Sequence, residues 1–143
     1  MTPLRTLIAI LTFILFASGA AADEQPADTL VILSSDSLQT QGMAMVLSTS
    51  LQAREKQIHV LLCDQAGKLA VRDFQPESLA PRNVTPKDLL QNLMADGASV
   101  QVCALFLPNS DYQTNDLLDG VSVATPAEIT RLMVDPDVAI YTF

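Results

Sequence analysis

The sequence predicts an α/β fold: a five-stranded, mostly parallel sheet with helices on both faces, in three layers. Three observations lead to this prediction. Short runs of aliphatic and β-branched residues recur along the chain and are apolar on both faces, as in the buried strands of parallel sheets. Segments with apolar residues at helical spacing separate these runs. Helix-start signals precede two of those segments, which is the alternation that successive βαβ units produce.

The first two predicted strands enclose a predicted helix. Residues 29–33 and 57–63 have the composition of buried strands, and each run ends in a polar loop. Between them, residues 41–54 place apolar side chains three and four positions apart, which predicts a helix. Residues 68–86 contain three prolines and show no regular period. We expect them to form a long surface excursion that covers part of the functional site.

The third predicted strand follows a helix with clear boundaries. Thr85 precedes Pro86 at the start of the helical pattern, so Thr85 is expected as the N-cap and Pro86 as the first helical residue. Gly97 follows the pattern and suits the left-handed conformation that ends many helices. The next apolar run, residues 98–104, is therefore predicted as the third strand.

The end of the chain repeats this arrangement. After a polar loop, residues 120–123 predict a brief fourth strand. Thr125 and Glu128 have the spacing of a capping box at the start of another helix. Residues 138–143 then predict the fifth strand. Because no internal repeat is evident, we expect a single domain over residues 23–143.

The first 22 residues have the composition of a cleavable secretory signal peptide. Arg5 gives a positive start, residues 7–17 are almost wholly apolar, and Ala20 and Ala22 supply the small residues of a cleavage site. As a helix the apolar stretch spans about 16 Å, whereas a hydrocarbon core is about 30 Å thick. An uncleaved anchor is therefore disfavoured. We expect export, cleavage after Ala22 and a periplasmic or secreted domain.

The composition excludes several classes of partner. Cleavage removes one of eight basic residues, leaving seven Lys and Arg against sixteen Asp and Glu, a formal charge of −9. The domain has no basic run, so we expect neither nucleic acid nor, after cleavage, a membrane surface as a partner. No Trp and few aromatic residues are available for stacking on bases or sugars. We expect no cofactor or metal, because no phosphate loop, zinc pattern or Ser/His/Asp set is evident.

The two cysteines of the predicted domain are its strongest candidate functional residues. Ligands of open parallel sheets bind at the carboxyl ends of the strands, and Cys63 and Cys103 both lie there. Successive strands are often neighbours, so the two thiols are expected to lie close together. A short helix after Cys103 would favour the thiolate, which is the nucleophile of sulfur transfer. Alternatively, both cysteines are inert or form a structural disulfide in a non-catalytic, oligomeric binding module.

Five further side chains are weaker candidates. Asp36 and Asp64 follow the first two strands and are placed to orient a substrate. Met43 and Met45, with the cysteines, are soft donors suited to Cu(I), but residues two apart on a helix point in different directions. Methionine is also a common core residue. His59 lies within a strand, where a buried, hydrogen-bonded histidine is favoured over a ligand or base.

The sequence resembles the DsrE-like sulfur-relay family, most strongly from residue 89 onward. In that family a Val-Cys pair ends the third strand. A D-L-L-x-G-V segment follows after a short helix and loop, and a strand closes the chain. The matching segments are residues 89–90, 97–98, 100–103, 116–121, 128–129 and 137–143.

The resemblance implies a doubly wound sheet of five parallel strands and assembly into homotrimers or homohexamers. It also implies a reactive cysteine that carries persulfide sulfur between donor and acceptor proteins or small sulfur species. That cysteine corresponds to Cys103, with Cys63 as a resolving or supporting thiol. Pro108 falls shortly after Cys103 and limits the helix expected there to about one turn.

Overall fold

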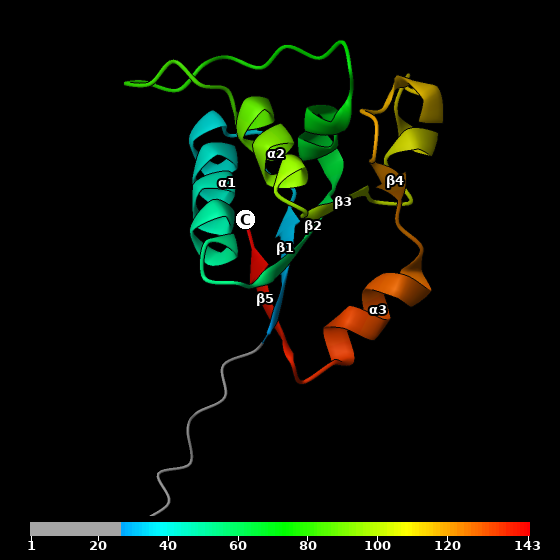
Figure 1. Cartoon of the computed structure of the whole chain (residues 1–143). Helices are drawn as coiled ribbons and strands as arrows, with labels where there is room; N and C mark the ends of the chain where they lie inside the picture. Colours follow the sequence, from blue (N-terminus) through cyan, green and yellow to red (C-terminus); the bar gives the residue numbers. More distant parts are fainter. Residues whose placement is uncertain (1–26) are drawn as a thin grey trace, which may run out of the picture.

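The computed structural model describes residues 27–143 and confirms the α/β fold, with one sheet between helices (Figure 1). All five strands are parallel and follow the order β4-β3-β2-β1-β5. The predicted signal peptide, residues 1–22, lies outside the described residues. Within residues 27–143, no helix has both the length and the apolar character needed to cross a membrane. The strands are β1 (Asp28–Leu33), β2 (Gln57–Leu62), β3 (Ser99–Val102), β4 (Ser122–Val123) and β5 (Val138–Thr142).

The strand order explains which face of the sheet each helix covers. The chain moves from β1 to β2 to β3 in one direction. Right-handed crossovers therefore put α1 (Leu38–Gln52) and α2 (Pro86–Ala95) on the same face, where they pack together. The chain then returns across the sheet from β4 to β5, so α3 (Pro126–Val134) lies on the opposite face. This arrangement forms the three predicted layers.

The alternation of side chains along β2 and β3 decides which face the cysteines take. Leu62 and Val102, the last residues of these strands, are fully buried in the core beneath α1 and α2. The next residues, Cys63 and Cys103, therefore fall on the face that α3 covers. Both continue the ladder of the sheet, since the N–H of Cys63 donates to Leu33 O and that of Cys103 to Leu62 O, each at 2.8 Å.

The helix starts follow from local capping. The predicted capping box at Thr125 is confirmed, and Thr85 forms a second one with Asp88. However, α1 begins three residues before the predicted boundary, because the side chain of Ser37 accepts a hydrogen bond from the N–H of Thr40. Apolar spacing locates the buried face of a helix, but a polar cap sets its first turn.

The prediction of a surface excursion over residues 68–86 is wrong for the first residues of this segment, most of which are buried. A 3₁₀ helix, η1 (Asp64–Ala70), follows β2 directly, and its Leu69 is fully buried. Val71 is also in the core and bridges Leu117 in an antiparallel pair. The chain from residue 72 to 83 is mostly exposed, as expected. The apolar residues of this region therefore extend the core beside α2.

Lys87 holds this region against α2. It is only 7% exposed, and its Nζ donates to the carbonyl oxygens of Val71, Arg72 and Phe74 at 2.8, 2.7 and 2.8 Å. Burial lowers the pKa of Lys87, while two neighbouring aspartates oppose the shift. All three ammonium protons are thus used to satisfy the backbone of the turn after η1.

Replacing Lys87 by methionine is expected to destabilise the fold by about 2–3 kcal/mol, because the side chain keeps its length but leaves three inward carbonyl groups without their donor. Urea unfolding followed by circular dichroism measures the change. Arg82→Met removes a positive charge from an exposed side chain and is the matched control. Equal stability of the two variants would contradict the structural role of Lys87.

Candidate functional site

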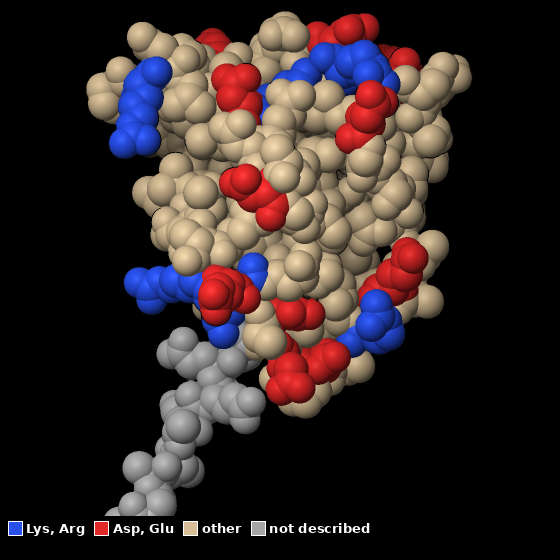
Figure 2. Space-filling view, viewed as in Figure 1, with Lys and Arg blue, Asp and Glu red and all other residues tan. Residues whose placement is uncertain are grey.

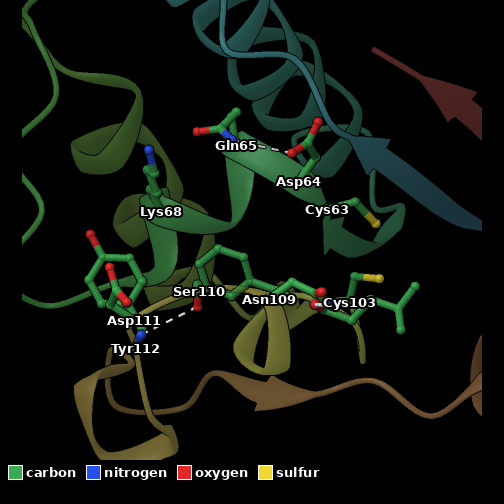
Figure 3. A pocket seen from close by; sticks show the side chains of 11 residues that line it. Cys63, Asp64, Gln65, Lys68, Cys103, Asn109, Ser110, Asp111 and Tyr112 are labelled. Atoms are coloured by element: carbon green, nitrogen blue, oxygen red, sulfur yellow. Dashed lines mark hydrogen bonds between the residues drawn. The ribbon is translucent and has the colours of Figure 1, made fainter.

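The two cysteines lie together at the carboxyl edge of the sheet, as predicted. Each follows its strand by one residue, and the register pairs Leu62 with Val102 just before them. Both are free thiols and half-buried. They line a pocket of about 650 Å³ between η1 and the chain after β3. In Figure 3 the thiols lie at one end of this pocket, with Lys68 and Tyr112 toward the other.

The two thiols differ in their electrostatic surroundings. The pKa of Cys63 is raised from 9.0 to about 12, chiefly by burial, then by its hydrogen bond with Cys103, the charge of Cys103 and the charge of Asp64. Cys63 therefore keeps its proton at neutral pH. The hydrogen bond with Cys103 favours this protonated form of Cys63.

The helix expected directly after Cys103 is replaced by turns. The predicted short helix is a turn over residues 104–106 followed by one 3₁₀ turn, η2 (Leu107–Asn109), which includes Pro108. The longer helical segment, η1, follows Cys63 instead. A single turn carries little dipole, so the dipole argument for a Cys103 thiolate loses its physical basis.

A contact between aromatic residues and glycine holds the two sides of the pocket together. The ring of Phe106, which is 7% exposed, packs directly on Gly67 of η1, where a Cβ atom would overlap the ring. Phe106 also stacks on Tyr112, with centroids 6.0 Å apart and an angle of 24° between the rings. The segment after Cys63 is thereby fixed against the segment after Cys103.

Gly67→Ala is expected to displace the Phe106 ring and destabilise the fold by about 1–3 kcal/mol. Gly42→Ala is the matched control, because the nearest atoms to its Cβ all belong to the flexible side chain of Leu79, a half-buried residue of the exposed loop, and the closest is a terminal methyl group. Alanine favours the helix there by about 1 kcal/mol, which offsets the contact. Thermal unfolding of both variants tests the difference, and Gly67→Ala as stable as Gly42→Ala would contradict this packing.

The structure separates the two aspartates proposed to orient a substrate. Asp64 is exposed on the thiol pocket beside Cys63. Asp36 instead lines a second hollow of about 460 Å³. The two hollows share Gln65 and Lys68, which the sequence analysis did not identify. Their spacing of three residues places them on one face of a 3₁₀ helix, so recognition of η1 would have found them.

The methionines and the histidine lie away from the thiols. Met43 is 53% exposed and Met45 is fully buried, so they do not form a pair of soft ligands. In the described part of the chain, no group of three or more His, Cys, Asp or Glu is arranged to hold a metal. His59 is half-buried, with Nδ1 2.9 Å from Ser99 Oγ and Nε2 3.7 Å from Asp28 Oδ2. Tertiary structure thus forms a Ser/His/Asp set not evident in the sequence, near the amino ends of β1, β2 and β3.

Fold and site together define a small parallel α/β domain with a pair of free thiols in a pocket at the carboxyl edge of its sheet. Known protein families and curated proteins give no match to the sequence. Solved structures do match. The ychN protein from E. coli has a TM-score of 0.69 at 19% identity, over 83% of this chain and 100% of that one. MTH1491 from Methanobacterium thermoautotrophicum, a protein of unknown function, has a TM-score of 0.67 at 18% identity, over 81% and 98%. Both have the DsrE-like fold, and at this identity the similarity concerns the fold alone.

Proposed function

We propose that this protein is an exported sulfur carrier in which Cys103 holds persulfide sulfur and Cys63 supports it as a hydrogen-bond donor. The observation that carries this proposal is the pair of free, adjacent thiols in an open pocket, one of which keeps its proton. The DsrE-like fold and the Val-Cys context of Cys103 agree with it. Export rests on the signal-peptide pattern of residues 1–22.

The proposed transfer involves no net oxidation. The Cys103 thiolate attacks the outer sulfur of a donor persulfide, a new S–S bond forms at Cys103, and the donor leaves as a thiolate. Unloading is the reverse reaction with an acceptor thiolate, and Cys103 is then the leaving group. The Cys63 thiol stabilises the charge on Cys103 in both steps, because it donates a hydrogen bond to that sulfur.

The raised pKa of Cys63 favours a supporting over a resolving role. As a resolving thiol, Cys63 would attack the inner sulfur of a Cys103 persulfide, form a disulfide with Cys103 and release hydrogen sulfide. That attack requires the Cys63 thiolate, which is scarce below pH 12. A protonated Cys63 therefore prolongs the life of the loaded state until an acceptor arrives.

We also propose a homotrimer or homohexamer, as the family resemblance implies. Exposed apolar side chains on α1 and on the edge strand β5 support this assembly, because small monomeric domains seldom leave such groups uncovered. They include Met43 at 53%, Val46 at 48%, Leu47 at 43% and Tyr141 at 45% exposure. Light scattering at micromolar concentration measures the assembly, and a monomer mass would remove this part of the proposal.

Incubation of the reduced protein with polysulfide tests the carrier function. We expect an adduct of one sulfur atom in the intact mass, mapped to Cys103 by peptide analysis and removed by a reductant. Counting free thiols in the native and denatured protein addresses the alternative. Absence of thiols in both states would indicate a structural disulfide and a binding module, and absence of any sulfur adduct would overturn the carrier function.

A further inference from the structure

The thiol pocket continues into a groove across η1. Its second part is the hollow of about 460 Å³ that shares Gln65 and Lys68 with the thiol pocket. Apolar side chains line both parts, with Phe106 and Tyr112 in the first and Phe74 and Pro76 in the second. The two hollows adjoin at Gln65 and Lys68 and together form a surface longer than either one. Figure 3 shows the thiols at one end of the first hollow. We call this surface the thiol groove.

The charges along the thiol groove are mostly negative. Asp64 and Asp111 are exposed in its first part, and Asp36 and Glu77 in its second, against the single ammonium of Lys68. The ion pairs found within residues 27–143 join His59 to Asp28 and Arg72 to Asp119, so none of them involves a groove carboxylate. Asp64 accepts a hydrogen bond from Gln65 at 3.4 Å. Figure 2 shows acidic side chains spread over the face it presents, in line with the negative net charge of the chain.

The size and charge of the groove distinguish between possible sulfur partners. A small anionic species such as polysulfide fills little of about 650 Å³ and meets a rim of net negative charge. An extended peptide matches an elongated groove with apolar walls, since each residue adds roughly 3.3 Å of length. Basic side chains flanking the reactive cysteine of such a peptide would pair with the groove carboxylates.

We propose that the thiol groove docks an extended, basic segment of a partner protein whose cysteine exchanges sulfur with Cys103. This inference rests on the proposed carrier function and names the class of its partner. The persulfide of the segment reaches Cys103 in the first hollow, while its flanking Lys or Arg side chains lie against Asp36 and Glu77 in the second. Sulfur passes to the Cys103 thiolate, and the segment leaves as a cysteine thiolate.

The test compares two synthetic persulfidated peptides of equal length, in which lysine or glutamate residues flank one cysteine. Intact mass follows sulfur transfer to the full mature protein. We expect transfer from the lysine peptide to be at least about tenfold faster at low ionic strength, and the difference to shrink as salt is added. Asp36→Asn combined with Glu77→Gln should remove most of that advantage.

A matched control removes the same two charges elsewhere. Glu55 and Asp96 are exposed and lie just before β2 and β3, at the opposite edge of the sheet from the thiols. Glu55→Gln with Asp96→Asn should therefore leave the preference for the lysine peptide intact. An equal loss in both double variants would show a general charge effect and overturn the docking inference.

The remaining outcomes separate this inference from the carrier function. If Cys103 accepts sulfur from polysulfide and from both peptides at equal rates, the carrier function stands and the basic partner is wrong. If polysulfide loads Cys103 faster than the lysine peptide at equal concentration, the groove serves small anions and the inference fails. If Cys103 accepts sulfur from none of the three donors, the carrier function itself is wrong.

Discussion

Replacing Cys103 by alanine is expected to abolish sulfur loading from polysulfide, whereas Cys63→Ala retains it at a lower rate. In the proposed function Cys103 supplies the nucleophile, so its loss leaves only a thiol that stays protonated at neutral pH. In the proposed mechanism Cys63→Ala removes a hydrogen bond to the reacting Cys103 thiolate, and a hydrogen bond to a charged group contributes about 1.5–3 kcal/mol. We therefore expect loading at pH 7 to slow by about tenfold or more in that variant.

Both variants are expected to keep the fold, because the cysteines are half-buried at a strand end beside an open pocket. Circular dichroism and urea unfolding check this point, and intact mass over time gives the loading rate. Loading that survives Cys103→Ala would overturn the assignment of the carrier residue. A Cys63→Ala variant that loads as fast as the wild type would leave the carrier intact but remove the supporting role of Cys63.

Alkylation of Cys63 is expected to be about a thousandfold slower than that of an ordinary thiol near pH 8. Its pKa of about 12, against 9.0, lowers the thiolate fraction by three powers of ten. In Cys103→Ala the hydrogen bond and the charge of Cys103 disappear, while burial and Asp64 remain. The pKa of Cys63 should then fall below 12 but stay above 9.0, and its alkylation should be faster than in the wild type.

The pH dependence of the free energy of unfolding gives an independent check of the raised pKa of Cys63, and the direction of the expected change is defined. The folded state raises the pKa of Cys63, so it binds the thiol proton more tightly than the unfolded chain does. This contribution is complete below pH 9 and is lost as the pH rises toward 12. Urea unfolding between these values should show the wild type losing stability relative to Cys63→Ala. If stability changed with pH equally in the wild type and in Cys63→Ala, the raised pKa of Cys63 would be contradicted. If alkylation of Cys63 were unchanged in Cys103→Ala, the coupling of the two thiols would be contradicted.

Local signals in the sequence were sufficient for the fold class and for the edge that carries the thiols. Apolar runs locate buried strands because a parallel sheet is covered on both faces. Capping patterns at Thr85 and Thr125 place two helix starts because the cap bonds involve residues three positions apart. Alternating strands and helices then put Cys63 and Cys103 at one edge, since all carboxyl ends of a parallel sheet meet there.

Tertiary structure decided the chemistry of that edge. The strand order makes β2 and β3 neighbours, and this brings the two thiols into hydrogen-bonding contact. The raised pKa of Cys63 depends on burial, on Cys103 and on the charge of Asp64, which are properties of the folded surroundings.

Contacts formed only in the folded chain also explain why some residues of the site were not found from the sequence. Gly67 and Phe106 are far apart in the chain, and their contact fixes the pocket only after η1 packs against the segment after Cys103. Lys68 joins the two hollows because a 3₁₀ helix, and not a surface loop, follows β2. The residues 29–33 and 58–63 specified their strands by local composition alone. Long-range packing decided which residues surround Cys63 and which hollows Lys68 lines. A single sequence, read locally, does not determine such packing.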